Sequence, residues 1–170
     1  MALLTKLALN TSQNVLLKAA INANPLWAAF PLNSDGDYGL AIELNKVAVP
    51  DYIVWRTDVT RAEIYGATSI EATNWSFVTY KAQTLQEQNT WVEMFTEGQA
   101  NFALLNLRTA VGSIFGVNAA PTLHVLAIAK RPAKYAEKIL ASGAGTLLAP
   151  STMTLVGNIT PAEVQVARMS

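Results

Sequence analysis

The single histidine is the first residue to consider as a catalytic group. His124 lies within an apolar run that the sequence predicts to be helical. Nucleophilic catalysis needs an activated nucleophile and usually a base that a third group orients. The sequence suggests no such partners for His124. Its position therefore predicts a core or interface residue, and we expect the chain not to be an enzyme.

Two aspartates that flank a glycine, Asp35 and Asp37, imitate the start of a calcium loop. An EF-hand loop needs further oxygen ligands at fixed positions and a glutamate at its twelfth residue. Asn45 and Lys46 stand in that neighbourhood instead, so the match fails. The pattern predicts an Asp-Gly turn between helices, and we expect no metal site.

The remaining acidic residues have ordinary explanations. Glu93 and Glu97 are one helical turn apart near a predicted helix end, where solvated charge is common. Glu63 and Glu163 each stand three residues after a threonine, which is the capping-box pattern of a helix start. The segment 143–146 lacks the strand and helix that a dinucleotide site requires, and we expect no cofactor. The absence of cysteine excludes disulfides, zinc thiolates and thiol catalysis.

One basic cluster contains Lys130, Arg131, Lys134 and Lys138. Such a cluster either ends a helix, where cations suit the helix dipole, or contacts an acidic face of a partner. Lys plus Arg and Asp plus Glu are 12 each, so the formal net charge is zero. Without a basic excess to bind a phosphate backbone, nucleic acid is not an expected partner.

Apolar periodicity and capping signals predict a mainly α (α+β) fold. In the first helix, Val15, Leu16, Ala19, Ala20 and Ala23 recur at helical spacing. The predicted elements are a helix from about 10–12 to 23, a short helix from about 38 that stops before Pro50, a short extended segment at 52–55, and helices at 60–65, 75–95, 105–115 and 119–130. Pro132 either kinks the last of these helices or separates it from a helix at 133–141. Along 75–95 one apolar stripe, broadened by Trp91, contains Val78, Ala82, Leu85, Val92 and Phe95.

The character of the chain changes after Gly145. Residues 152–156 alternate with β-rich composition, and Gly157 and Asn158 form a predicted turn before a short helix through Val166. We therefore expect a compact helical body at 1–145 and a C-terminal arm of strand, turn and short helix at 146–170. The strand and tail are expected to reach a neighbouring subunit.

The composition combines 51% hydrophobic residues with only 14% charged residues, against about 25% charged in ordinary soluble domains. Subunit interfaces deplete charge in this way, so we expect self-assembly. A monomer with a polar, uncharged surface is the alternative. The four tryptophans fit core or interface positions equally. The candidate protein-contact residues are Trp55, Arg56, Arg61, Lys130, Arg131, Lys134, Leu155 and Val156.

The start of the chain only faintly imitates a signal peptide, because Lys6 interrupts the apolar run and Asn10 ends it. No stretch approaches 18 apolar residues, so we expect no membrane span.

Several segments share an order and spacing with a known group of proteins. They are Tyr52–Thr57, Val59–Ile64, Trp91–Phe95, Asn106–Phe115, Lys130–Ala133, Ala136–Lys138, Gly143–Thr146 and Met153–Gly157. In these segments the chain resembles small, largely uncharacterised proteins encoded among the structural genes of tailed bacteriophages and prophages. The resemblance spans about 26–166. Members often have cysteine before the Lys-Arg pair, where this chain has Ala129, which argues against an essential thiol.

The resemblance implies a virion setting and brings no catalytic residues. The expected role is a non-catalytic structural subunit, an oligomeric neck (head–tail connector) or tail component, made in the bacterial host cytoplasm and located in the virion. Its expected partners are copies of itself and other phage structural proteins. Two alternatives remain, a capsid cement or decoration protein and a non-virion assembly factor such as a tail chaperone.

Overall fold

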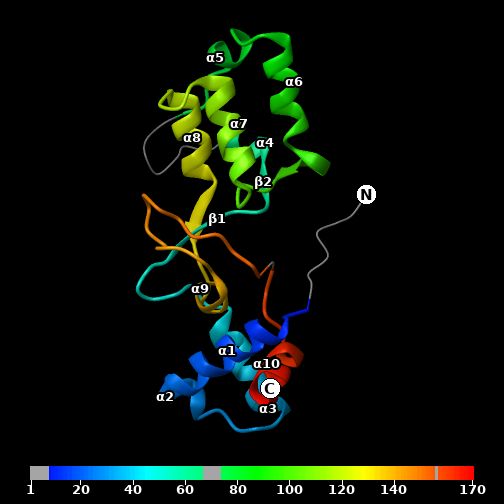
Figure 1. The fold of residues 1–170 in the computed structure, drawn as a ribbon, viewed down its shortest axis with the longest axis vertical. Coiled ribbons are helices and arrows are strands. Elements are labelled where there is room, and N and C mark those ends of the chain that lie inside the picture. The colour runs from blue at the N-terminus through cyan, green and yellow to red at the C-terminus, as the bar shows by residue number, and fades with distance from the viewer. Residues whose placement is uncertain (1–7, 67–73, 156) are drawn as a thin grey trace. The chain divides into compact units, whose positions relative to one another are not determined.

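The computed structural model describes residues 8–66, 74–155 and 157–170 of the chain. These residues contain ten α-helices and four short strands, which confirms the predicted α-dominated α+β class. The chain divides into two compact units. Unit 1 combines the described part of 1–54 with 132–170, and unit 2 is the described part of 55–131. Unit 2 is thus inserted between the two segments of unit 1 (Figure 1).

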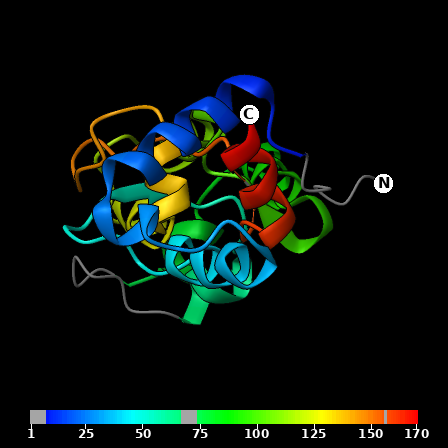
Figure 2. The same ribbon diagram turned by 90° about the horizontal axis from the view of Figure 1, so that it is seen from below.

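Unit 1 is a small helical assembly. Its helices are α1 (Thr11–Ala23), α2 (Pro25–Ala28), α3 (Ser34–Leu44), α9 (Tyr135–Leu140) and α10 (Pro161–Met169). The C-terminal helix α10 packs against both α1 and α3, and Figure 2 shows it (red) beside α1 (blue) and α3 (cyan). The core that these helices enclose is aliphatic, with Leu17, Leu40, Leu44, Leu140 and Val164 among its buried members.

Helix α1 begins and ends where the sequence predicts. Asn10 caps it, because its side-chain oxygen accepts the Gln13 N–H at 2.9 Å and the Gln13 side chain returns the bond. The helix ends before Pro25, since the residue before proline avoids the α region. The apolar residues that recur at helical spacing are not the ones that fill the core: Val15, Leu16 and Ala19 are exposed, whereas the core takes Leu17 and Ile21.

Helix α3 begins inside the segment predicted as a turn. The Asn33 side chain accepts the Gly36 N–H at 2.9 Å and caps the helix, so Asp35 and Asp37 lie in its first turn. A Cβ on Gly36 would stand only 1.9 Å from the Pro31 carbonyl oxygen. The close approach of the 31–33 segment to α3 therefore requires glycine at this position.

The C-terminal segment contributes to the core of unit 1. Leu155, Ile159, Val164 and Ala167 are all buried there, so the boundary between the two units differs from the predicted boundary at residue 145. The predicted capping box of α10 is confirmed, with Thr160 N–H donating to Glu163 Oε2 at 2.8 Å.

The predicted strand at 152–156 is reduced to isolated bridges. Ser151 pairs with Val54, and Thr152 pairs with Ser142. No longer ladder forms among the described residues of this segment.

Unit 2 carries five helices and most of the strand structure. Its elements are β1 (Ile53–Trp55), β2 (Val59–Thr60), α4 (Arg61–Gly66), α5 (Phe77–Lys81), α6 (Leu85–Glu93), a 3₁₀ turn (Thr96–Gly98), β3 (Gln99–Ala100), α7 (Leu105–Phe115), α8 (Ala120–Ile128) and β4 (Lys130–Pro132). Strand β2 pairs antiparallel with β3. The chain enters unit 2 within β1 and leaves it within β4, and these two strands are hydrogen-bonded neighbours.

The long helix predicted at 75–95 is two helices. Thr84 forms a capping box with Glu87, because Thr84 N–H donates to Glu87 Oε2 at 2.8 Å, and this box starts α6 as a new helix. The predicted apolar stripe is buried only near its C-terminal end: Val78 and Leu85 are exposed, while Trp91 and Phe95 are buried.

The core of unit 2 contains a cluster of aromatic rings among its aliphatic side chains. Trp75 and Trp91 stack with ring centroids 5.1 Å apart, and Phe115 meets Trp91 edge-on at 5.4 Å. Phe95 packs edge-on against Trp91 at 4.9 Å, and Trp91 Nε1 donates to the Tyr65 hydroxyl at 3.1 Å. Such ring pairs stabilise a core beyond the area they bury.

Candidate interaction surfaces

His124 belongs to the interior of unit 2. Its side chain is 0% exposed, and Nε2 lies 2.8 Å from the Ile64 carbonyl oxygen, where a protonated Nε2 donates. The contact connects α8 to α4 and satisfies a buried polar group. The geometry therefore agrees with the predicted core position.

The described acidic residues do not gather into a ligand set. No group of three or more histidine, cysteine, aspartate or glutamate side chains in the described part of the chain has the geometry to hold a metal ion. Asp37 instead forms an ion pair with Arg168 at 2.7 Å, and the two side chains are only 8% and 7% exposed.

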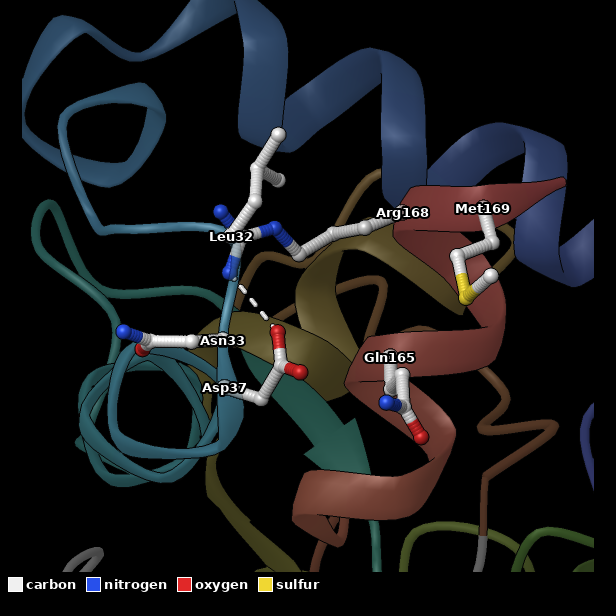
Figure 3. Close-up of a pocket in the computed structure, with 6 residues that line it drawn as sticks. All are labelled: Leu32, Asn33, Asp37, Gln165, Arg168 and Met169. Atoms are coloured by element: carbon white, nitrogen blue, oxygen red, sulfur yellow. Dashed lines mark hydrogen bonds and ion pairs between the residues drawn. The ribbon is translucent and has the colours of Figure 1, made fainter.

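Arg168 connects three parts of unit 1. Besides Asp37, its guanidinium donates to the Phe30 carbonyl at 2.7 Å and to the Pro31 carbonyl at 3.1 Å. Figure 3 shows it reaching from α10 across to the Leu32 segment, with the dashed line to Asp37. The contacts satisfy most of its donors, so this arginine acts as a clamp that fixes α10 and the 30–33 segment to α3.

A small hollow of about 80 Å³ lies beside the clamp. It is lined by Leu32, Asn33, Asp37, Gln165, Arg168 and Met169 (Figure 3). Its charged groups are already paired with each other and Asn33 caps α3. The hollow therefore has room for a few waters but offers no unpaired charge to a ligand.

The outer face of α1 is apolar, and the described residues of unit 1 leave it exposed. We call Val15, Leu16, Ala19 and Ala23 the α1 surface, because all four are exposed and recur at helical spacing. Val15 and Leu16 are 54% and 53% exposed. Since the opposite face of the same helix fills the core, α1 is apolar on two sides, which is typical of a helix buried by a further contact.

Three of the predicted contact residues lie together in sequence at the start of unit 2. Trp55 is half-buried beneath the Arg108 guanidinium, 4.6 Å from the ring centroid, with Lys130 Nζ at 5.8 Å. Arg56 forms ion pairs with Asp58 at 3.1 Å and Glu63 at 2.8 Å. Arg61 lies 5.8 Å from the Phe95 ring centroid.

The Arg56 network fixes the start of α4. Partial burial by itself would raise the pKa of the Glu63 carboxyl. Hydrogen bonds from the Thr60 N–H and from Arg56 outweigh that effect, so the pKa lies below its ordinary value. Glu63 thus serves both the predicted capping box and an ion pair. This network gives Arg56 a structural role inside unit 2.

The predicted basic cluster is divided between the two units. Lys130 and Arg131 belong to unit 2 within β4, whereas Lys134 stands before α9 in unit 1. Lys134 Nζ donates to the Asn158 side-chain oxygen. The segment is therefore a strand and a helix start, and not the solvated end of a single helix.

The last two predicted contact residues lie in the C-terminal segment. Leu155 is only 2% exposed and packs in the core of unit 1, so its side chain offers no surface to a partner. Val156 lies outside the described residues.

Sequence reasoning missed Arg108, which lies in the first turns of α7. Its guanidinium stacks on Trp55 and donates through Nη1 to the Phe102 carbonyl oxygen. A tryptophan and an arginine far apart in the sequence carry no local signal that they will meet. Only the packing of α7 against β1 brings them together.

Comparison with family models, with curated proteins and with solved structures found no match for the chain.

None of the described helices is long and apolar enough to cross a membrane.

Proposed function

We propose that the chain is a non-catalytic structural subunit of a tailed-bacteriophage particle, an oligomeric neck (head–tail connector) or tail component. It acts by binding alone, because the folded chain docks against copies of itself and against other structural proteins. The observation that carries the assembly part of this proposal is the α1 surface. The setting in a virion rests on the resemblance of the segments between about 26 and 166 to phage structural-module proteins.

The α1 surface has the features of a contact between subunits. It presents two exposed branched side chains, Val15 and Leu16, beside two alanines that let another surface approach closely. Lys18 is the only charged residue of the helix, so little charge would have to be desolvated. Loss of charge and gain of aliphatic area distinguish the core of a subunit interface from ordinary surface.

Two residues that are chemically reactive in other proteins are occupied by structural contacts here. His124 is enclosed and bonded to Ile64, and Asp37 is paired with Arg168. Neither presents a free group to a substrate. These positions favour an assembly role over a catalytic one.

The first test is the mass of the purified chain in solution across a concentration series. A closed hexamer or dodecamer is expected for a neck or tail ring. A trimer would favour the capsid cement alternative, and a monomer at every concentration would contradict self-assembly. Mass spectrometry of purified phage particles then separates a virion subunit, which is present in them, from a tail chaperone, which is absent.

Two variants test the α1 surface itself. Ala19→Glu places a charge in the middle of the surface and is expected to weaken association about tenfold or more. Ala62→Glu is the matched control, since it introduces the same charge at an exposed helical alanine of unit 2. Equal effects of both variants would mean that α1 is not the contact.

A further inference from the structure

Arg108 is a cation with an incomplete set of partners. In the described structure its guanidinium uses one nitrogen on the Phe102 carbonyl and lies over the Trp55 ring. A guanidinium carries five N–H donors in a fixed fork, and the others have no acceptor among the described residues. As far as the described residues go, its remaining N–H donors are therefore open to a further acceptor.

The charge of Arg108 is also uncompensated within the described part of unit 2. Partial burial lowers the pKa of the Arg108 guanidinium, and no described carboxylate lies close enough to oppose this effect. Arg56, in the same unit, shows the contrast, because it meets both Asp58 and Glu63. A carboxylate placed on Arg108 would gain a bidentate, charge-assisted pair.

Two exposed apolar residues precede this cation at helical spacing. Leu104 and Leu105 stand four and three residues before Arg108, on the same side of the start of α7, and are 50% and 67% exposed. We call Arg108, Trp55, Leu104 and Leu105 the Arg108 site. Arginine and tryptophan are among the side chains that most often dominate the energy of an interface.

Unit 2 also carries a carboxylate that fits this site. Glu97 is exposed at the tip of the 3₁₀ turn and forms no ion pair with a described residue. Its backbone has φ 55° and ψ 25°, and it is the only non-glycine residue at positive φ in the described chain. Residues other than glycine rarely adopt this conformation, and those that do are often at functional positions.

The charge distribution favours a protein carboxylate over nucleic acid. The segment 55–131 has as many acidic as basic residues, and Arg56 of the same unit is already paired with two acids. A phosphate backbone is held by several cations together. Arg108 and Lys130 both lie over Trp55, which is fewer cations than such a backbone needs, and the donor fork of Arg108 matches one carboxylate.

We propose that Glu97 of one copy of the chain binds the Arg108 site of another copy. This inference rests on the proposed function, since it names a second contact, besides the α1 surface, by which the subunits associate. The contact joins two different side chains of the same unit, and such a contact can repeat from copy to copy and build a ring. Leu104 and Leu105 become covered when the pair forms.

Charge reversal in the full chain tests the pair. Arg108→Glu and Glu97→Arg are each expected to weaken self-association about tenfold or more. The double variant, R108E with E97R, restores the pair in the opposite sense and should return association to within about threefold of the original. The readout is solution mass over a concentration series, at low and at high salt.

Two further variants guard the interpretation. Arg108→Gln keeps a donor for the Phe102 carbonyl while it removes the charge, so a fold that is intact by near-ultraviolet circular dichroism, with weakened association, supports the site. Arg61→Glu is the matched control, because it reverses another arginine over an aromatic ring of unit 2. Weakening by Arg61→Glu equal to that by Arg108→Glu would overturn the inference.

The outcomes separate this inference from the proposed function. If the unmodified chain associates and neither charge reversal changes the association, the Glu97–Arg108 pair is wrong while self-assembly stands. If the single variants fail to associate and the double variant also fails, the direct pair is wrong. If the unmodified chain is a monomer at every concentration, both proposals are wrong.

Discussion

Unit 1 closes an aliphatic core with segments from 8–54 and 132–170, whereas unit 2 closes a core that contains a cluster of aromatic rings within the described part of one uninterrupted segment, 55–131. In unit 1 the two segments are joined by the buried Asp37–Arg168 pair. Unit 2 consists of one segment, and its core is centred on Trp91, which stacks on Trp75 and meets Phe95 edge-on. The two units therefore depend on different interactions, and we expect them to respond to different perturbations.

The largest expected effect comes from deletion of residues 146–170. The deletion removes Leu155, Ile159, Val164 and Ala167 from the core of unit 1 together with Arg168. At about 1.5–3 kcal/mol for each large buried apolar side chain, the loss exceeds the stability of a small unit. Unit 1 should unfold while unit 2 stays folded.

Hydrogen exchange measured by mass spectrometry checks this prediction segment by segment. Amides of α1 and α3 should lose protection, and amides of α7 and α8 should keep it. Protection of α1 after the deletion would mean that 146–170 is a detachable arm, as the sequence predicts, and would remove the distinction drawn between the units.

Removal of the indole ring at the centre of unit 2 tests how far the aromatic cluster stabilises that unit. Trp91→Ala removes a fully buried indole that contacts Trp75, Phe95 and Phe115, and should lower the free energy of unfolding of unit 2 by about 4 kcal/mol. Trp27→Ala is the matched control in unit 1, since Trp27 is only partly buried against Tyr135. Urea denaturation should show a clearly smaller loss for the control.

Arg168→Met tests how much the buried Asp37–Arg168 ion pair stabilises unit 1. The substitution leaves the Asp37 carboxylate buried without a cation, and should lower the free energy of unfolding of unit 1 by about 3 kcal/mol. The double variant Asp37→Leu with Arg168→Met removes both charges and should recover most of the loss. An Arg168→Met protein as stable as the unmodified chain would contradict the clamp.

Acid should act on unit 2 through Glu63 with the smallest effect of this series. The pKa of its carboxyl is lower in the folded state than its ordinary value, so this stabilisation is present above the unfolded pKa and is lost as the pH falls through the folded pKa. Glu63→Gln should reduce that acid dependence and cost less than about 1 kcal/mol near neutral pH. Thermal unfolding at several pH values measures this acid dependence of stability. If Glu63→Gln leaves it unchanged, groups other than Glu63 cause it.

Local signals in the sequence predicted the ends of several helices. Asn10, Thr60 and Thr160 each cap a helix as expected, and the bounds predicted for α7, 105–115, are confirmed. These features depend on residues within one turn of each other, so neighbouring side chains determine them. The capping box at Thr84 has the same local pattern, and reading it would have divided the predicted helix at 75–95 correctly.

The faces of the helices could not be predicted in the same way. Helix α1 carries apolar residues around most of its circumference, so periodicity does not choose which side is buried. Tertiary packing makes the choice, and it leaves Leu16 and Val78 exposed while it buries Leu17 and Trp91. The Asp37–Arg168 and Trp55–Arg108 contacts likewise join residues that share no local pattern.

The insertion of unit 2 between the two segments of unit 1 has a consequence for synthesis on the ribosome. Unit 2 is completed once residue 131 has left the exit tunnel, whereas the 8–54 segment must wait for α9 and α10. During that interval Leu17, Leu40 and Leu44 lack the side chains that later cover them. Nascent chains expose apolar surface in this way and are prone to aggregate. The period between translation of residue 54 and residue 170 is therefore when this chain most needs a holding chaperone.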